Sequence, residues 1–244
     1  MRFLLCLCVF VIGCTKNPDE LVIGTEPSFP PFESKNERGE YVGFDMDMAR
    51  ELAKDLGKTL VIKPMEFPSL PTALETGKID IIISGMTATE ERAKSMTFTK
   101  PYFLTGLCLL VNAKSGITGK ADADGKKFVV KRGTTGDINV KRLFPNAKVT
   151  RLETEADCAL EVVNGRADAF IYDQLSIVKH NEANPKTTRA LLTPLTKEPY
   201  AMAVRLNDKA RVNRLNKFLD DIRADGRYEK MRKKHLAGLP DGAR

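Results

Sequence analysis

A short apolar run at residues 79–83 constrains the fold of this chain more than any other segment. It follows Gly77, is rich in isoleucine, and is too short for a surface helix. Such a run is typical of a buried strand in a parallel sheet, which needs cover on both faces. The strand stops at a polar turn, and residues 89–92 have the composition of a first helical turn.

The polar turn after this strand is a candidate binding site for a carboxylate. Ser84, Gly85, Met86 and Thr87 combine two hydroxyl groups with a glycine at which backbone N–H groups can be exposed. Arg92 follows, and its planar guanidinium can bind a carboxylate through two parallel hydrogen bonds. The alternative is a capped helix with Arg92 as a solvated surface charge.

Strands and helices alternate before this turn. We expect a strand at residues 21–24, an amphipathic helix at 45–56 and a strand at 60–64. Ser69 can cap a short helix that ends near Gly77. This order predicts an α/β fold with a doubly wound sheet.

The second half of the chain repeats the pattern. The expected strands lie at residues 107–111, 128–130, 149–152 and 167–171, with a helix at 155–164 and a helical tail from 207. The flanks of the strand at 107–111 suggest that the chain crosses there from one lobe to another. The segment at 195–204 is interpreted as the second crossing.

Two loops in the first half present candidate ligand contacts. Glu26 and Phe29 lie in a proline-rich loop at the carboxyl end of a strand, where open α/β sheets bind ligands. Glu26 can accept hydrogen bonds and Phe29 can form an apolar wall. The alternatives are that Glu26 is a solvated loop charge and that Phe29 is a core residue. Phe67 lies in the later loop before Ser69.

Two strand ends in the second half carry further candidates. Lys131 precedes a turn in which Thr134 and Thr135 lead into a helix, and the free N–H groups of a helix start can bind an anion. A phosphate loop is the competing interpretation, but the turn lacks the glycine and lysine spacing of a Walker motif. Asp173 follows the strand at 167–171, either as a ligand contact or as a helix cap.

The N-terminus has the composition of a secretory signal. One charge, Arg2, precedes an apolar run, and the sequence before Cys14 resembles a lipoprotein processing site. We therefore expect a signal peptide at residues 1–13 and a lipidated tether at 14–19. Cys108 and Cys158 then remain, more consistent with two buried free thiols than with a disulfide.

Charge and composition exclude several other classes. The formal net charge is +7 and the pI about 9.1, but the basic residues are dispersed and lack interleaved aromatic residues, so nucleic acid is not an expected partner. His180 and His235 are the only histidines and have no metal-ligand spacing. We expect neither a metal nor another cofactor.

The segment at residues 77–102 resembles the signature of the polar amino-acid binding proteins of ABC importers, bacterial solute-binding protein family 3. The matching residues are Gly77, Lys78, Asp80, Gly85, Met86, Thr87, Thr89, Arg92, Phe98, Thr99, Pro101 and Tyr102. Further matches lie at residues 24–33, 43–47 and 132–135. The resemblance covers about residues 21–239 and is closest in character to arginine-binding lipoproteins.

This resemblance implies a periplasmic-binding-protein-like fold of type II, whose two α/β lobes are joined by two hinge crossings and close over one amino acid. Lobe 1 is expected at residues 20–106 plus 198–244 and lobe 2 at residues 107–197. The implied partners are the membrane subunits of an ABC transporter. The implied location is the periplasm or the cell surface, with a lipid on Cys14 as the membrane anchor.

The resemblance also assigns the two charged ends of the ligand. Arg92 is expected to hold the α-carboxylate, with help from Thr87 and from Thr135 of the opposite lobe. Asp173 and the Gly85 carbonyl are expected to receive the α-ammonium. A zwitterion removed from water needs such compensation at both ends.

The expected side-chain contacts favour arginine, with lysine or histidine next. Phe29 and Phe67 are expected to sandwich the ligand side chain, with Glu26 at its far end. Glutamine competes, because Lys131 can repel a cation and Gly136 stands where some basic amino-acid binders carry glutamine. The full expected ligand-binding set is Glu26, Phe29, Phe67, Ser84, Gly85, Met86, Thr87, Arg92, Lys131, Thr134, Thr135 and Asp173.

Two other classes compete with the importer. A dehydratase-like enzyme on the same scaffold could use Glu33 or Asp173 as its acid or base. A surface lipoprotein that binds a host or cell-wall molecule would expose an apolar patch.

Overall fold

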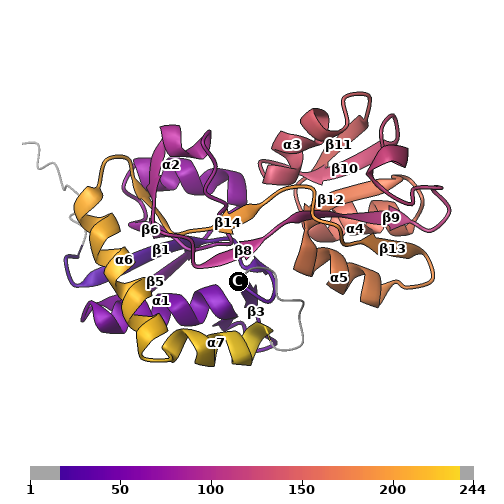
Figure 1. Ribbon diagram of the computed structural model, residues 1–244. Helices are drawn as coiled ribbons and strands as arrows, with labels where there is room; N and C mark the ends of the chain where they lie inside the picture. The colour runs from indigo at the N-terminus through magenta and orange to yellow at the C-terminus, as the bar shows by residue number, and fades with distance from the viewer. Residues whose placement is uncertain (1–16, 237–244) are drawn as a thin grey trace, which may run out of the picture.

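The computed structural model describes residues 17–236 as two α/β lobes side by side, joined by two neighbouring strands (Figure 1). The predicted signal peptide, Cys14 and the tether as far as residue 16 lie outside the described residues. Within residues 17–236, no helix combines the length and the apolar character that a membrane span requires.

Lobe 1 contains a five-stranded sheet in the order β5-β1-β6-β15-β7. Its strands are β1 (Glu20–Thr25), β5 (Thr59–Pro64), β6 (Ile81–Ile82), β7 (Met96–Phe98) and β15 (Ala203–Arg205). A small second sheet comprises β2 (Ser28–Phe29), β3 (Glu33–Lys35) and β4 (Tyr41–Val42). The strands β5, β1 and β6 are parallel, whereas β15 is antiparallel to both of its neighbours.

The helices of lobe 1 cover both faces of the large sheet. They are α1 (Phe44–Asp55), α2 (Leu70–Glu75), α6 (Lys209–Ala224) and α7 (Arg227–Leu236), with the 3-10 turns η1 (Phe67–Ser69) and η2 (Arg92–Lys94). Successive side chains of a strand point to opposite faces. Val22 accordingly packs with the α2 residue Leu70, while Leu21 and Ile23 belong to the cluster that contains α1 and α6 (Figure 1).

Lobe 2 contains a second five-stranded sheet, in the order β11-β10-β12-β9-β13. Its strands are β9 (Leu107–Asn112), β10 (Lys127–Lys131), β11 (Lys148–Leu152), β12 (Ala169–Asp173) and β13 (Thr188–Leu191). Its helices are α3 (Thr135–Leu143), α4 (Glu155–Val163) and α5 (Gln174–Ala183), with the 3-10 turn η3 (Lys120–Asp122). The expectation of two α/β lobes is confirmed.

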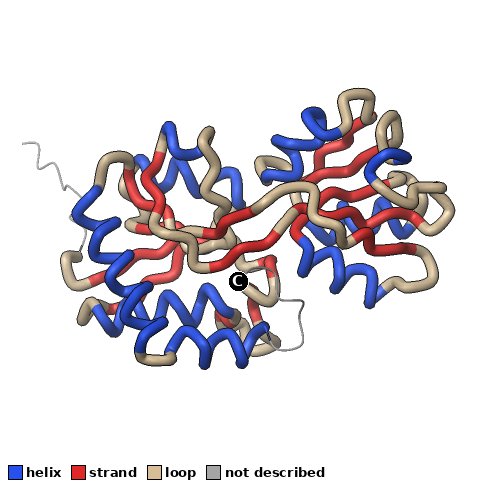
Figure 2. The backbone as a smooth tube through the Cα atoms, in the orientation of Figure 1, coloured by secondary structure: helices blue, strands red, loops and turns tan. Residues whose placement is uncertain are grey.

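Two antiparallel strands connect the lobes, β8 (Phe103–Thr105) and β14 (Glu198–Tyr200) (Figure 2). Gly106 lies where β8 leaves for lobe 2. A Cβ atom there would lie 2.7 Å from the Pro194 side chain and from the Thr196 carbonyl oxygen, so only glycine lets the two segments approach this closely. The chain therefore passes between the lobes twice, both times through the antiparallel pair of β8 and β14.

Several local expectations need correction. The strand expected at 79–83 is reduced to β6, although all five residues are buried, and residues 89–92 lead only into the single 3-10 turn η2, because β7 begins at Met96. Ser69 precedes α2 but makes no side-chain cap bond. Its backbone is already helical, which directs the hydroxyl away from the capping position.

The buried residues of the tail agree with the expected helical face. Leu215, Leu219 and Ile222 of α6 are buried, and Phe218 joins them. Cys108 and Cys158 are buried and not joined in a disulfide, which confirms the interpretation as free thiols. Burial raises the pKa of each to about 12, so both remain thiols at neutral pH.

Candidate functional site

The carboxyl ends of strands from both lobes meet at one small cavity. Strands β1 and β6 approach it from lobe 1, and β10 and β12 approach it from lobe 2. We call this space the interlobe cavity. Its lining residues are Glu26, Phe29, Glu33, Phe67, Ser84, Gly85, Thr87, Arg92, Thr134, Thr135, Tyr172 and Asp173.

Arg92 is the cation at one side of the interlobe cavity. Its guanidinium donates to the Thr87 carbonyl at 2.9 Å and, across the cleft, to the Gly133 carbonyl at 3.1 Å. It also lies 5.2 Å from the centre of the Phe67 ring. Burial lowers the pKa of Arg92 to about 10, so the guanidinium remains charged at neutral pH. The two hydrogen bonds hold the guanidinium in place for an anion.

Glu26 and Lys131 form an ion pair between the lobes at the opposite side. The Lys131 ammonium lies 2.5 Å from the Glu26 carboxylate, and the two side chains are only 1% and 9% exposed. Burial raises the pKa of Glu26, against the lowering effect of Lys131. The interlobe cavity, which Glu26 lines, has a volume of only about 20 Å³. A space of this size does not hold an amino acid, so a ligand can enter only if the lobes move apart.

Asp173 is a buried carboxyl at the end of β12. The alternative interpretation as a helix cap is not supported, because its side chain makes no cap bond and accepts instead from the Tyr200 hydroxyl at 2.5 Å. Burial raises the pKa of Asp173 to about 7. The carboxyl is therefore partly protonated at neutral pH, and a cation beside it would favour its charged form.

This raised pKa predicts a pH-dependent cost in stability. Folded Asp173 keeps its proton to about pH 7 but unfolded aspartate only to about 3.8, so the folded state binds more protons in between. The contribution of Asp173 to the free energy of unfolding is therefore largest below about pH 3.8. It falls by on the order of 4 kcal/mol as the pH rises to about 7. Urea unfolding measures this change. Between pH 4.5 and pH 8, the free energy of unfolding of wild type should fall relative to that of Asp173→Asn. A constant difference between the two proteins, or an equal change in the exposed control Asp220→Asn, would contradict the shift.

Two glycines keep the cavity walls close together. Gly85 has a φ of +50°, and a Cβ there would lie 2.7 Å from the Phe29 ring. A Cβ on Gly136 would lie 2.5 Å from the Ile171 carbonyl oxygen, so α3 can pack against β12 only with glycine at this position. A glutamine at this position would have no room in this backbone.

The structure brings most of the expected site residues together, with Met86 as the exception. The Met86 side chain is fully buried in the lobe 1 core beside α2, and we correct its assignment to the cavity wall. Thr134 caps α3, which leaves Thr135 at the first helical position. Lys131 reaches the site through Glu26. Phe29 packs edge-on against Tyr172, at a centroid distance of 5.7 Å.

Two residues near the cavity, Tyr172 and Tyr200, were not assigned to it from the sequence, and Glu33 was named only as an acid or base of the enzyme alternative. Tyr172 precedes Asp173 and could have been found from that position at a strand end. Tyr200 comes from the hinge strand β14 and carries no local signal. Glu33 lines the cavity and accepts from the Ser84 hydroxyl at 2.8 Å.

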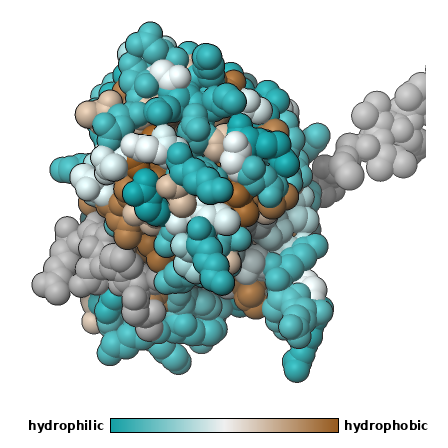
Figure 3. Space-filling view, turned by 90° about the vertical axis from the view of Figure 1, so that its right-hand side faces the viewer, coloured by the Kyte–Doolittle hydropathy of each residue, from teal (hydrophilic) through white to brown (hydrophobic). Residues whose placement is uncertain are grey.

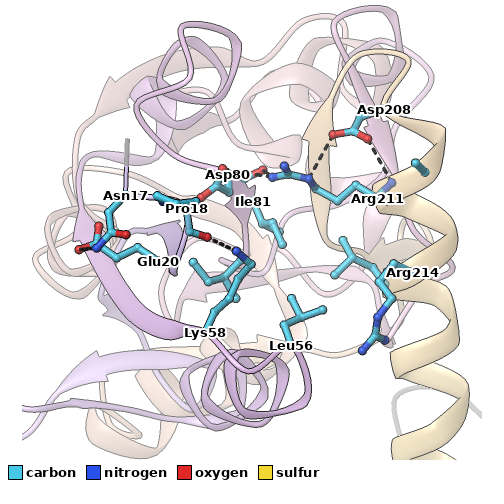
Figure 4. Close-up of a pocket in the computed structure, with 13 residues that line it drawn as sticks. Asn17, Pro18, Glu20, Leu56, Lys58, Asp80, Ile81, Asp208, Arg211 and Arg214 are labelled. Carbon is cyan, nitrogen blue, oxygen red and sulfur yellow. Dashed lines mark hydrogen bonds and ion pairs between the residues drawn. The ribbon is translucent and has the colours of Figure 1, made fainter. Parts of the chain in front are cut away.

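A second cavity, of about 470 Å³, lies on lobe 1 beside α6 (Figure 4). Its charged groups are already paired: Arg211 contacts Asp80 and Asp208, Lys58 donates to a backbone carbonyl, and Arg214 contacts Asp55. Its residues come from one lobe only. Although this cavity is larger than the interlobe cavity, it cannot be a site that both lobes share.

The fold and the cleft define a two-lobed solute-binding protein. The model of the bacterial extracellular solute-binding proteins, family 3, matches residues 21–238, and the chain belongs to this family.

Curated relatives resemble nearly the whole chain. A probable histidine-binding protein of Neisseria gonorrhoeae is 33% identical, over 91% of this chain and 85% of its own length. The ABC transporter glutamine-binding protein GlnH of Bacillus subtilis is 32% identical, over 94% and 85%. The ABC transporter arginine-binding protein 1 of Escherichia coli is 30% identical, over 92% and 93%.

Solved structures agree with these relatives. A putative binding component of an ABC transporter from Wolinella succinogenes, complexed with lysine, has a TM-score of 0.84 at 38% identity, covering 91% of this chain and 97% of its own. An ancestral arginine-binding protein bound to arginine also has a TM-score of 0.84, at 36% identity over 90% and 99%. All five are named as binding proteins or binding components, three of them of ABC transporters, and this chain is a binding protein and not an enzyme.

Proposed function

We propose that this protein binds a polar L-amino acid between its two lobes and delivers it to the membrane subunits of an ABC importer. We assign residues 20–106 and 198–236 to lobe 1 and residues 107–197 to lobe 2; the rest of the expected lobe 1, residues 237–244, lies outside the described residues. Closure follows because the ligand contacts both lobes only when they meet. The names of the relatives support this function, and so does the polarity of the cleft.

The interlobe cavity offers opposite charges for the two ends of an amino acid. Arg92, Thr87 and Thr135 bind the α-carboxylate, and Asp173 with the Gly85 carbonyl receives the α-ammonium. These groups come from both lobes, so a bound zwitterion strengthens closure.

The ion pair between Glu26 and Lys131 decides the ligand side chain. A neutral amide that enters between them accepts from the lysine and donates to the glutamate, so neither buried charge loses its partner. A guanidinium satisfies Glu26 but leaves the Lys131 ammonium facing a second cation. We therefore place glutamine first, ahead of the arginine that the sequence favours.

Arginine is the second candidate, because acidic groups outnumber the lysine at this end. Glu66 and Glu155 both raise the pKa of Glu26, so three carboxylates act here against Lys131. Neutral histidine also offers one donor and one acceptor.

Calorimetric titration of residues 15–244 with glutamine, arginine, histidine, lysine and glutamate tests the proposal. We expect glutamine to bind at least about tenfold more tightly than arginine, since a tenfold ratio needs only 1.4 kcal/mol. Tighter binding of arginine reverses the order of the candidates but leaves the amino-acid site intact. If none of the five binds, the proposed function is wrong.

The membrane anchor is a separate proposal. A lipid on Cys14 would hold the protein at a bacterial membrane, in the periplasm or at the cell surface. The proposal is supported by the processing sequence before Cys14. Membrane fractionation of the full chain tests it: wild type should sediment with membranes and Cys14→Ser should not.

The surface-ligand alternative finds little support on the lobe 2 face. Hydrophilic residues cover most of this face, with hydrophobic residues in small groups between them (Figure 3). The exposed large apolar side chains of lobe 2 helices, Ile138 and Leu160, lie on the different helices α3 and α4. Single exposed apolar residues of this kind are normal on soluble proteins.

A further inference from the structure

Two buried carboxyl groups lie directly behind the binding turn of lobe 1. Glu33 comes from β3 and Asp45 from the first turn of α1, and their exposures are 1% and 0%. The proposed function uses neither of them. Glu33 bonds to Ser84 and Asp45 bonds to the adjacent Gly85, so the two carboxyl groups are held at neighbouring residues, and each affects the pKa of the other through side-chain hydrogen bonding.

Each carboxyl also holds one residue of the binding turn. Glu33 Oε1 accepts from the Ser84 hydroxyl at 2.8 Å, and Ser84 Oγ in turn accepts from the Glu26 backbone N–H at 3.0 Å. Asp45 Oδ2 accepts from the Gly85 N–H at 2.8 Å and from the Tyr102 hydroxyl at 2.7 Å. The pair thus fixes both Ser84 and Gly85.

The remaining two oxygens define where a proton must lie. Glu33 Oε2 and Asp45 Oδ1 are buried, and no donor among the described residues bonds to either. Two ionised carboxyl groups cannot bond to each other, because both only accept. A proton on one of them converts the contact into a hydrogen bond and gives both oxygens a partner.

Among the residues that the structure describes, no cation is among the main causes of the pKa shifts of this pair. The causes are burial, the two carboxyl groups themselves, Glu26 on the neighbouring loop, and hydrogen bonds to Ser84, Gly85 and Tyr102. Tyr228 of α7, whose pKa Asp45 raises, is also neutral. The cleft cations are bound elsewhere, Arg92 to backbone carbonyls and Lys131 to Glu26.

We propose that Glu33 is a neutral carboxylic acid that donates its proton to the Asp45 carboxylate, and that this shared proton positions the Ser84–Gly85 turn for ligand binding. Asp45 then accepts three hydrogen bonds, from Glu33, Gly85 and Tyr102. Glu33 is a positioning residue, since it acts through Ser84.

The titration behaviour of the pair supports this arrangement. Burial raises the pKa of Asp45 to about 6, so Asp45 is ionised at pH 8. Burial, together with the Asp45 charge, raises the pKa of Glu33 well above its usual range. The pair therefore holds one proton between these two limits. Loss of that proton at higher pH leaves two adjacent buried charges, which displace the turn and weaken binding.

Infrared spectroscopy of the protein without added amino acid tests the proton directly. At pH 8 we expect the C=O stretching band of a protonated carboxyl in wild type. It should persist in Glu37→Gln, which changes an exposed residue of the same lobe, and disappear in Glu33→Gln. If wild type and Glu33→Gln show the same carboxyl bands, Glu33 is ionised and the inference is wrong. This result does not depend on whether any amino acid binds.

The positioning role rests on the proposed function and is tested with glutamine and arginine as probes. Glu33→Ala should weaken binding at pH 7.5 more than tenfold, and Glu33→Gln should recover most of the loss, because its amide can donate to Asp45. As the pH rises above 8 and through the raised pKa of Glu33, wild type should lose affinity by up to about tenfold per pH unit more than Glu33→Gln does. The positioning role is overturned if the pH profiles of wild type and Glu33→Gln are parallel, or if Glu33→Gln binds no better than Glu33→Ala. If no wild-type binding is observed, the proposed function fails while the infrared result still decides the proton.

Discussion

Replacement of Arg92 by alanine is expected to weaken amino-acid binding by roughly 30- to 700-fold. Removing one member of a buried, hydrogen-bonded charge pair costs about 2–4 kcal/mol, because the ligand carboxylate is then desolvated without a partner. Arg92 donates to the Thr87 carbonyl of its own lobe and to the Gly133 carbonyl of the other, and these bonds hold its guanidinium beside the cavity. Calorimetric titration with glutamine and arginine measures the loss.

Arg92→Lys and Lys94→Ala complete this experiment. Lysine keeps the charge but loses the planar fork, so Arg92→Lys should recover only part of the affinity. The Lys94 side chain is 71% exposed, two residues away, and its removal should change little. Wild-type affinity in Arg92→Ala would show that the carboxylate binds elsewhere.

Replacement of Lys131 by glutamine is expected to shift selectivity toward arginine by at least tenfold relative to glutamine. The substitution removes a buried ammonium at the far end of the cleft, while the new amide can still donate to Glu26. Glu26 is then free to pair with a guanidinium. The ratio of the Kd values for the two amino acids, in wild type and variant, measures the shift.

The neighbouring Arg132 provides the control for this charge change. Its side chain is 51% exposed and pairs with Glu153 outside the cavity, so Arg132→Gln should leave the ratio unchanged. An unchanged ratio in Lys131→Gln would mean that the ligand side chain does not reach this lysine.

The positions of the site residues were predictable because they follow local rules. Glu26, the turn at residues 84–87 and Asp173 each come directly after a strand, and the carboxyl ends of parallel strands share one edge of a sheet. The same reasoning placed Thr134 and Thr135 at a helix start. Strand and helix boundaries therefore placed these residues at one edge, and the resemblance to the family assigned them to a ligand site.

The pairing of these residues was not predictable in the same way. Glu26 and Lys131 are 105 residues apart and meet only because the two lobes face each other. A helix cap was the alternative interpretation of Asp173, and its side chain instead accepts from the hydroxyl of Tyr200 on a hinge strand and makes no cap bond. Met86 belonged to the motif but turned inward, since its neighbours already form the surface of the turn. Tertiary contacts decided each of these cases.

The sheet order also sets the order in which the two lobes can complete their folding during synthesis. All strands of lobe 2 lie within one uninterrupted segment, from β9 to β13, whereas the large sheet of lobe 1 has β15 between β6 and β7. As the chain leaves the ribosome from its N-terminus, lobe 2 has all its strands while lobe 1 still lacks one. Until β15 arrives, β6 and β7 each present an open edge, which is where unfinished sheets aggregate. A nascent chain that stops before residue 203 thus carries one complete sheet and one incomplete sheet.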